Sequence, residues 1–174
     1  AGLCTVTATA AAGTINNVAY SAATTVESFT IYPAVLKVTA INLSVVYGQP
    51  LPSLTPVLNV SYSLTGFVHG DNASAVNGVP ALSTTATSSS APGTYPIMVR
   101  TGTLASMNYS FLYVNGTLTV DQPPSITSAN TTTFAVGTAS AFTVTASGYP
   151  ASITYSYSGT LPTGVTLSTV GVLS

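Results

Sequence analysis

The chain has 174 residues, of which only two are Lys or Arg and three are Asp or Glu, and its formal net charge is −1 at pH 7. So few cations cannot neutralise a phosphate backbone or hold a polybasic anchor on a membrane, which excludes nucleic-acid binding and that kind of anchor. The mean hydropathy is +0.51, but no apolar run approaches the ~18 residues that a membrane-spanning helix needs, so we expect no membrane insertion by this chain. The apolar residues alternate with Thr and Ser instead, which predicts a mainly β fold of half-buried strands.

The first segment, residues 1–33, contains two predicted strands, over residues 3–9 and 27–32, joined by a loop of small residues through Asn16–Tyr20. Cys4 alternates with threonines in the first strand, so we expect it to be buried as a small hydrophobe. A single cysteine forms no intrachain disulfide, and no basic neighbour activates its thiol. Two strands are marginal by themselves. We therefore interpret this segment as the closing hairpin of a preceding domain, in a fragment whose export signal lies elsewhere.

The middle segment, residues 34–121, is predicted to be one complete module. Leu36, Val38 and Ala40 alternate with polar residues, which indicates a strand with one buried face. A short helix is predicted over Asp71–Val76, with Asp71 as its N-cap. Further strands are expected over residues 57–64, 81–86, 93–101 and 109–114.

The end of the middle segment has the pattern of a β-hairpin. Residues 111–114 and 117–120 flank Asn115-Gly116, a pair favoured in two-residue type I′ turns. Such a turn would place Tyr113 opposite Leu118 and Phe111 opposite Val120. All four side chains would then share one face, so the register and the expected burial agree.

The third segment, residues 122–174, follows a predicted linker at Asp121-Gln122-Pro123-Pro124, where paired prolines favour an extended, unpaired chain. Alternating apolar residues predict strands over residues 142–146 and 153–157. An immunoglobulin-type sandwich needs about seven strands and ~100 residues, so this segment is interpreted as the first half of one.

Ordered landmarks between Leu36 and Val120 resemble the MBG ("mostly β-grasp") modules of bacterial surface proteins. They are Tyr47-Gly48, Gly66-Phe67-Val68-x-Gly70-Asp71, Gly93-Thr94-Tyr95-Pro96-Ile97, Asn108-Tyr109-Ser110-Phe111 and Gly116-Thr117-Leu118-Thr119-Val120. The chain departs from the pattern between Leu54 and Ser63, where extra residues precede Gly66-Phe67. The resemblance implies a β-grasp-like central domain with one short helix.

The flanking segments resemble Ig-like families. Leu161-Pro162-Thr163-Gly164-Val165-Thr166-Leu167 and Gly171-Val172-Leu173-Ser174 are similar to the signature of the He_PIG family, whose closing strands would follow. Cys4-x-Val6-x-Ala8 before an Asn-x-x-Tyr loop resembles the tail of bacterial Ig-like repeats. The resemblances imply tandem small β-modules, with partial Ig-like sandwiches on both sides of the centre. None of these families offers general catalytic residues to carry over.

Two arrangements of ionisable residues were weighed as catalytic sites. His69 and Asp71 are the only acid–base pair close in sequence, and a serine would complete a hydrolytic triad. No Gly-x-Ser-x-Gly elbow places such a serine, and turn and N-cap chemistry accounts for Asp71. Lys37, the sole lysine, suggests an isopeptide crosslink of the pilin type, but alternation places it on the polar face of its strand. We therefore predict no catalytic residue and no enzyme.

No metal or cofactor site is predicted either. The three acids are spread along the chain, with Glu27 in the first segment, Asp71 inside the middle segment and Asp121 at its end, whereas calcium takes six to eight oxygens with several carboxylates. Zinc is excluded by a single His and a single Cys. Asp121, at the junction of two segments, is the one calcium candidate, and a linker role explains it better.

Asn-x-Ser/Thr sequons and tyrosines remain as candidates for glycan chemistry. The sequons lie at Asn42, Asn59, Asn72, Asn108, Asn115 and Asn130. Their use for N-glycosylation presumes a eukaryotic secretory route. The ten tyrosines could stack sugar rings, although Tyr113, Tyr155 and Tyr157 are expected to face inward.

The sequence therefore predicts non-catalytic structural or adhesive spacer modules of a large bacterial secreted or cell-surface repeat protein, an adhesin-like role outside the cell. Neighbouring β-modules of the same chain are the expected partners. The alternative is a glycan- or protein-binding accessory module of an extracellular polysaccharide-active protein. A pocket ringed by Tyr and Asn side chains would favour the alternative, and a smooth, Thr-covered surface would favour the spacer.

Overall fold

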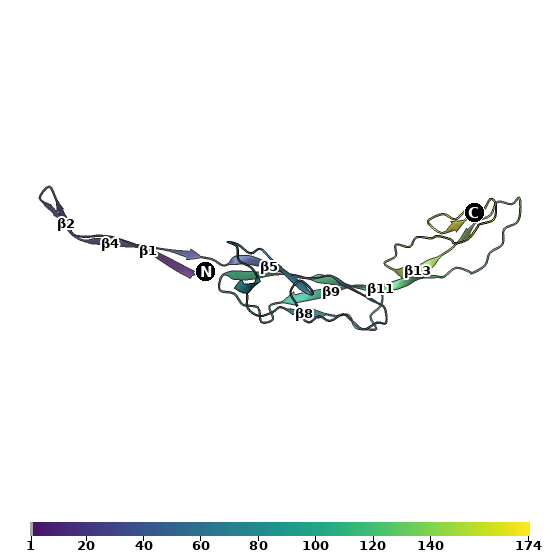
Figure 1. The fold of residues 1–174 in the computed structure, drawn as a ribbon, viewed down its shortest axis with the longest axis horizontal. Coiled ribbons are helices and arrows are strands. Elements are labelled where there is room, and N and C mark those ends of the chain that lie inside the picture. Colours follow the sequence, from purple (N-terminus) through teal and green to yellow (C-terminus); the bar gives the residue numbers. More distant parts are fainter. Residues whose placement is uncertain (1) are drawn as a thin grey trace. The chain divides into compact units, whose positions relative to one another are not determined.

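The computed structural model describes residues 2–174 and confirms a mainly β protein built from several small sheets (Figure 1). Ala1, the first residue of the predicted segment 1–33, lies outside the described residues. Within residues 2–174, no helix is long and apolar enough to span a membrane. The strands are β1 (Gly2–Ala10), β2 (Gly13–Ile15), β3 (Val18–Tyr20), β4 (Ala23–Ile31), β5 (Ala34–Ala40), β6 (Leu43–Val46), β7 (Tyr62–Thr65), β8 (Ala81–Thr84), β9 (Gly93–Arg100), β10 (Tyr109–Val114), β11 (Gly116–Ile126), β12 (Phe142–Thr143), β13 (Ala146–Tyr149) and β14 (Val172–Leu173), and the helix is a 3-10 turn, η1 (Ala73–Ala75).

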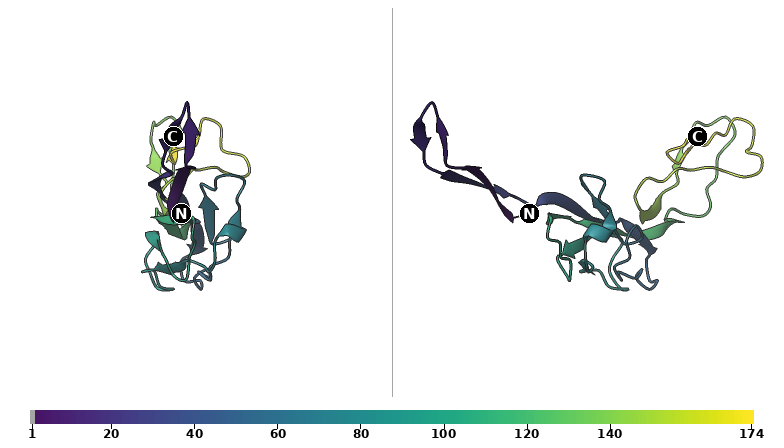
Figure 2. Two further views of the ribbon diagram at one scale, coloured as in Figure 1. Left: turned by 90° about the vertical axis from the view of Figure 1, so that its left-hand side faces the viewer. Right: turned by 60° about the vertical axis from the view of Figure 1, so that its left-hand side comes forward.

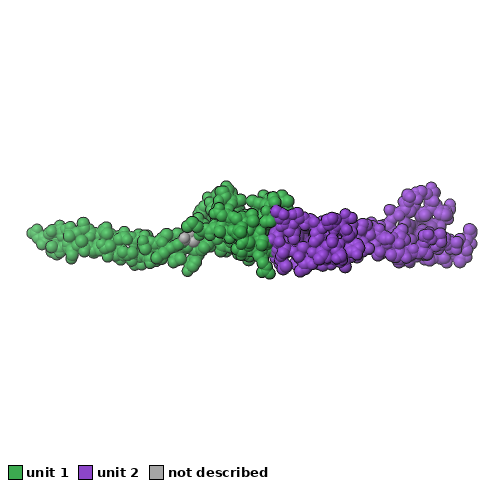
Figure 3. Space-filling view, turned by 90° about the horizontal axis from the view of Figure 1, so that it is seen from below, with its two compact units in different colours: residues 1–39, 56–81, 99–114 green, residues 40–55, 82–98, 115–174 purple. Residues whose placement is uncertain are grey.

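The chain divides into two compact units, which Figure 3 shows in two colours. Unit 1 contains Ala1–Thr39, Pro56–Ala81 and Val99–Val114. Unit 2 contains Ala40–Thr55, Leu82–Met98 and Asn115–Ser174. Each unit therefore gathers segments that are far apart in the sequence.

The N-terminal part of unit 1 is one long hairpin, visible as a two-stranded ribbon in Figure 2. β1 pairs antiparallel with β4 from Gly2↔Ile31 to Ala10↔Ala23, and β2 pairs with β3. The predicted loop is wrong here, because after a short unpaired gap the chain pairs again in β2 and β3, which are joined by a two-residue turn. In this turn Asn16 and Asn17 adopt φ values of 50° and 62°. Asn tolerates this left-handed conformation, which matches the twist of a hairpin.

The predicted burial of the hairpin is largely wrong. Cys4 is half-buried, but Val6 on the same face is 59% exposed and Phe29, the partner of Cys4, is 52% exposed. The alternation of side chains is correct, yet two strands alone provide no second layer against which a face can be buried.

The core of unit 1 lies on a three-stranded sheet in the order β10-β5-β7. β10 pairs parallel with β5, so that Phe111 lies beside Leu36 and Tyr113 beside Val38. Leu36 and Val38 are both 0% exposed. The predicted strand and its buried face are confirmed.

The predicted strand over residues 57–64 is shorter than expected, since β7 begins only at Tyr62. Residues 57–61 form a turn in which the Val57 amide donates to Ser61 Oγ at 2.7 Å and the Val57 carbonyl accepts from the Ser61 amide at 2.9 Å. Asn59 has φ 60° within this turn. A serine side chain that bonds to nearby backbone competes with a strand ladder, and here the Ser61–Val57 bonds replace the start of the predicted strand.

Unit 2 is organised around β11. The sheet has the order β13-β11-β9-β8, and β6 also pairs with β11. β11 runs antiparallel to β9 and parallel to β6. Leu118 and Val120 of β11 and Ile97 of β9 are at most 3% exposed, so they form the centre of this unit's core.

The predicted hairpin at Asn115-Gly116 is wrong. β10 pairs with β5 and β11 pairs with β6, β9 and β13, so Tyr113 does not lie opposite Leu118, nor Phe111 opposite Val120. Gly116 has no left-handed φ; instead, a Cβ there would lie 2.7 Å from the Ala40 carbonyl oxygen. The glycine is needed for a close approach of two backbone segments, not for a turn.

The predicted proline linker after Asp121 is also wrong, because β11 continues through it to Ile126. Gln122 pairs with Tyr149, and Ser125 pairs with Ser147 beyond a register shift. Pro123 and Pro124 fall inside this irregularity and have no pairing partner in β13, so their missing amide donors remove no hydrogen bond of the ladder.

The C-terminal part of unit 2 contains short strands. The strand predicted over residues 142–146 is divided into β12, which pairs with β14, and β13, which pairs with β11. Residues 150–158 form no strand, so the alternating pattern over 153–157 was misleading. Apolar alternation alone does not supply a pairing partner, and here only Ile153 and Tyr155 are half-buried.

Candidate functional site

The landmark residues around Gly66-Phe67 and Asn108-Tyr109 meet in one polar cluster of unit 1. The Tyr109 hydroxyl donates to Asp71 Oδ2 at 2.9 Å and accepts from the Val68 amide at 3.0 Å. The Phe67 and Tyr109 rings lie edge to face, with centroids 5.7 Å apart. Tyr109 is 3% exposed, so its hydroxyl fastens the loop that carries Asp71 onto the sheet edge strand β10.

The shape of the loop that carries Asp71 is set by its own backbone. The Asp71 amide donates to the Val68 carbonyl at 3.0 Å, and His69 and Gly70 both adopt left-handed φ values, 56° and 82°. Gly tolerates this conformation without cost, whereas a residue with a Cβ does so less readily.

The role predicted for Asp71 at a helix is wrong. The helix is the single turn η1, and its N-cap is Asn72, whose Oδ1 accepts from the Ser74 amide at 2.9 Å. Asp71 is instead the acceptor of the buried Tyr109 hydroxyl. In the described residues, no hydrogen bond or ion pair joins Asp71 to His69, the other member of the catalytic pair that was weighed. The carboxylate thus has a structural partner.

The pKa of the Tyr109 hydroxyl lies above its usual value of 10.0. The Val68 amide, which donates to the hydroxyl, lowers this pKa, but burial and the nearby Asp71 carboxylate together raise it by more. Ionised Tyr109 would face a carboxylate of the same charge. The hydroxyl therefore stays protonated at neutral pH and remains a donor to Asp71.

The candidate ligands for a metal lie on separate elements. Glu27 pairs with Val6 in the hairpin, Asp71 accepts from Tyr109, and Asp121 lies on β11 beside Val46. Residues 2–174 contain no group of three or more His, Cys, Asp or Glu side chains that could hold a metal ion. Lys37 lies on the exposed face of β5, as alternation predicted.

Two of the sequon asparagines have structural roles that sequence reasoning missed. Asn42 Oδ1 accepts from the Thr117 amide at 2.8 Å, and Asn72 caps η1. Asn42 follows β5 by two residues and is bonded to a residue 75 positions later. No local pattern predicts such a bond, whereas Asn72 could have been found from the general preference of Asn for N-caps.

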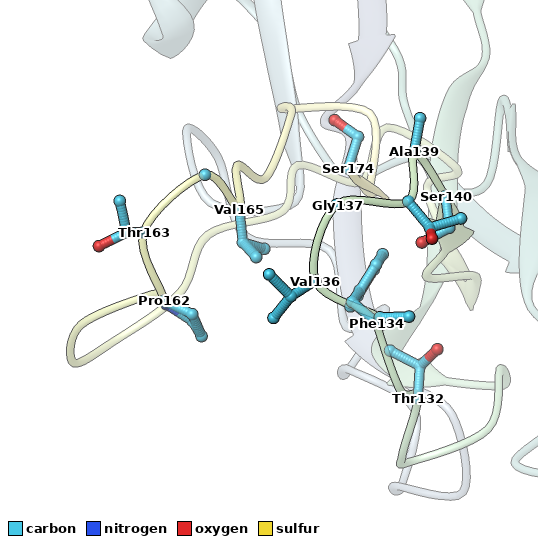
Figure 4. A pocket seen from close by; sticks show the side chains of 13 residues that line it. Thr132, Phe134, Val136, Gly137, Ala139, Ser140, Pro162, Thr163, Val165 and Ser174 are labelled. Atoms are coloured by element: carbon cyan, nitrogen blue, oxygen red, sulfur yellow. The ribbon is translucent and has the colours of Figure 1, made fainter.

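A cavity of about 660 Å³ lies in the C-terminal part of unit 2 and is shown in Figure 4. Phe134 and Val136 come from one loop, and Pro162 and Val165 come from another. Its lining contains hydroxyl groups and apolar side chains but no charged residue and no tyrosine. This composition offers no group for acid–base chemistry.

A second cavity, of about 400 Å³, lies where β11 pairs with β13. Its lining includes the residues Asp121, Gln122 and Tyr149. An aromatic ring beside polar groups with donors and acceptors is a combination that can bind a sugar. Of the tyrosines expected to face inward, Tyr113 and Tyr155 are half-buried, but Tyr157 is 56% exposed, so that prediction fails for Tyr157.

Comparison with known proteins finds one similarity, in the central part of the chain. Residues 36–119, just under half of the chain, match the family model of the MBG domain (YGX type). MBG domains are non-enzymatic, β-rich structural modules that occur in bacterial surface and secreted repeat proteins. No curated protein and no solved structure matches the chain.

Proposed function

We propose that the chain is a non-catalytic structural spacer, with an adhesin-like role, in a large bacterial repeat protein that is secreted or displayed on the cell surface. The proposed divisions are residues 1–33 as the end of an Ig-like domain, 34–121 as the MBG-like module and 122–174 as the start of a He_PIG-like domain. Its partners are then the neighbouring β-modules of the same chain, outside the cell.

The observation that carries this proposal is the continuity of β11. Its first half pairs with β6 and β9, and its second half pairs with β13. A single strand that takes part in two pairings connects the two paired regions more stiffly than a flexible linker does, because the residues of such a linker rotate freely. Such continuity is what a spacer needs in order to hold two modules at a fixed separation.

The role found for Asp71 supports the same conclusion. In a catalytic acid–base pair, the carboxylate would orient the imidazole of the base. Here Asp71 accepts from the buried Tyr109 hydroxyl instead. The residues that the family match covers are thus used to fasten a loop to the sheet, which is a structural use of a carboxylate.

Distance measurements between two spin labels test the spacer. Ser44 on β6 and Ser147 on β13 are both exposed, so Ser44→Cys and Ser147→Cys can be labelled in a Cys4→Ser background. If β11 is a stiff connection, the distance distribution has one narrow peak. A matched control pair, Ser44→Cys with Thr94→Cys, places both labels on exposed residues of the two strands that flank the first half of β11, and it reports the width within that half alone. A Ser44–Ser147 distribution much broader than this control would refute the spacer.

A second candidate function is glycan binding, and the cavity lined by Asp121, Gln122 and Tyr149 favours it. We expect a glycan array to separate the two functions. Binding of a glycan by the full chain, lost in Tyr149→Ala and kept in the matched control Tyr157→Ala, would establish this cavity as a sugar site. Binding that both variants keep would place any sugar site elsewhere.

A further inference from the structure

Parallel pairing between early and late strands occurs twice in this chain. In unit 1, β5 and β10 are paired in register from Tyr109↔Ala34 to Val114↔Thr39. The Ala34 amide also donates to the Asn108 carbonyl at 2.9 Å, which extends this ladder at its first end. Leu36 and Val38 lie on its buried face, so water does not reach that side of the ladder.

In unit 2, β6 and β11 are paired in parallel from Leu118↔Leu43 to Asp121↔Val46. The Tyr47 amide donates to the Asp121 carbonyl at 2.7 Å and extends this ladder at its last end. At its first end the Asn42 side chain accepts from the Thr117 amide at 2.8 Å. This amide oxygen supplies an acceptor just before the backbone pairing of β6 begins.

The direction of a ladder decides how it fails under tension. In a parallel pair, the start of one strand and the end of the other lie at opposite ends of the ladder. The chain enters β5 at Ala34 and leaves β10 at Val114, and it enters β6 at Leu43 and leaves the paired part of β11 at Asp121. Tension along the chain therefore slides the two strands of each ladder past one another, so that their hydrogen bonds are strained together.

The N-terminal hairpin provides the opposite case. β1 and β4 are antiparallel, and Gly2 pairs with Ile31, so both ends of the hairpin lie at the same end of its ladder. Tension then opens one residue pair at a time. No side chain of β1 or β4 is fully buried, so little apolar packing resists this opening.

We infer that the two parallel ladders form a mechanical clamp, by which the segment from Ala34 to Asp121 withstands tension along the chain while the hairpin Gly2–Ile31 yields first. This inference rests on the proposed function, because a spacer joined to neighbours at both ends carries the force that acts between them. It adds a second function, tensile resistance, to the separation of modules.

Single-molecule force spectroscopy on the full 174-residue chain, with handles at both termini, tests the order of events. Each residue released adds about 3.5 Å of contour length. Opening of the hairpin should therefore appear first and add about 100 Å, and the segment 34–121 should rupture at higher force and add up to about 300 Å. The inference is overturned if the longer event comes first or if both occur at the same low force.

The direction of pulling provides the stricter test. Gln49 is exposed and lies three residues after the end of β6. A handle on Gln49→Cys in a Cys4→Ser background, with the other handle at the C-terminus, therefore pulls the β6–β11 ladder from its Val46↔Asp121 end. A ladder opened in this way loses one pair at a time, so we expect the rupture force to fall at least about twofold. Equal forces in the two directions would overturn the clamp.

A matched pair of substitutions tests the Asn42 bond. Asn42→Ala and Asn72→Ala each remove one hydrogen bond that a side-chain oxygen accepts, and the two bonds have similar lengths, 2.8 Å and 2.9 Å. Only the Asn42 bond lies on a parallel ladder. We expect both to lower the melting temperature slightly, and only Asn42→Ala to lower the rupture force. Asn42→Asp keeps the acceptor and should restore that force. A rupture force that responds equally to both alanine substitutions contradicts the clamp.

These outcomes are independent of the test of the spacer. A low rupture force in every direction, combined with a narrow distance distribution between Ser44 and Ser147, would overturn the clamp and leave the spacer intact. A broad distribution would refute the spacer whatever the rupture force is.

Discussion

Replacement of Leu36 by Ala probes the buried face of β5 at its centre. Leu36 is 0% exposed and lies beside Phe111 in the parallel ladder. Truncation of such a leucine removes its transfer free energy and leaves a cavity, which together cost about 2 to 5 kcal/mol. Small domains unfold with only about 5 to 15 kcal/mol, so this single change removes a large share of the stability.

A control for Leu36→Ala lies on the same sheet. Leu112 of β10 pairs with Lys37, one residue along the ladder, and is 53% exposed. Leu112→Ala is the same chemical change on the opposite face, and exposed substitutions usually shift stability by no more than about 0.5 kcal/mol. The two variants therefore make the same chemical change in neighbouring strands of one sheet and differ in the burial of the leucine that is replaced.

Thermal unfolding followed by circular dichroism separates the two variants. Each kcal/mol lost moves the melting temperature of a domain of about 60 to 100 residues, the size range of the segment 34–121, by about 4 to 8 °C. Leu36→Ala should therefore lower it by on the order of 10 to 30 °C, and Leu112→Ala by less than about 4 °C. Urea titration should give the same ranking, with an unchanged slope. Equal losses in the two variants would refute the assignment of faces to β5 and β10, and with it the core of unit 1.

Three further predictions concern ionisation, the turn and salt. The pKa values of Tyr62, which burial raises, and of Tyr109 both lie above 10.0. Because the tyrosines of the unfolded chain ionise first, the free energy of unfolding should be constant below about pH 10 and decline above it. Tyr62→Phe should make this decline shallower in urea titrations at several pH values, and an unchanged decline would contradict the prediction. Asn17→Gly should slow hydrogen exchange in β2 and β3 because Gly adopts the left-handed conformation more readily, whereas Asn17→Val should speed it. With two cationic and three acidic side chains, the melting temperature should change by less than about 2 °C between low and physiological NaCl concentrations, since few charges are available to be screened.

Local patterns predicted the strands of this fold well where burial on one face imposes a period of two. The alternation of Leu36 and Val38 with polar residues predicted β5 and its buried face correctly. The same alternation at Ile153 and Tyr155 predicted a strand that does not form, because a strand also needs a partner with free backbone groups. The pairing partner of a strand is set by contacts between residues far apart in the sequence, and the local hydrophobic periodicity carries no information about these contacts.

The polar cluster could be predicted only in part. The residues Phe67, Asp71 and Tyr109 stood out in sequence as landmarks, but nothing local shows that Tyr109 donates to an acid 38 positions earlier. Asp71 was assigned to a helix N-cap because Asp favours that position, and the adjacent Asn72 took it instead. Two adjacent capping residues make such an assignment ambiguous by one position.

Gly116 explains why the hairpin prediction failed although its composition was favourable. A type I′ turn needs glycine for a left-handed φ, and the observed structure needs glycine for a different reason, since a Cβ would lie 2.7 Å from the Ala40 carbonyl oxygen. The same residue satisfies both requirements, so composition cannot distinguish them. The difference matters for mechanics: a hairpin of residues 111–120 would pair neighbours in the chain, whereas the observed pairing joins each of β10 and β11 to a strand about 75 residues earlier. Tension along the chain acts on such distant, parallel partners in shear, and a local hairpin could not provide that resistance.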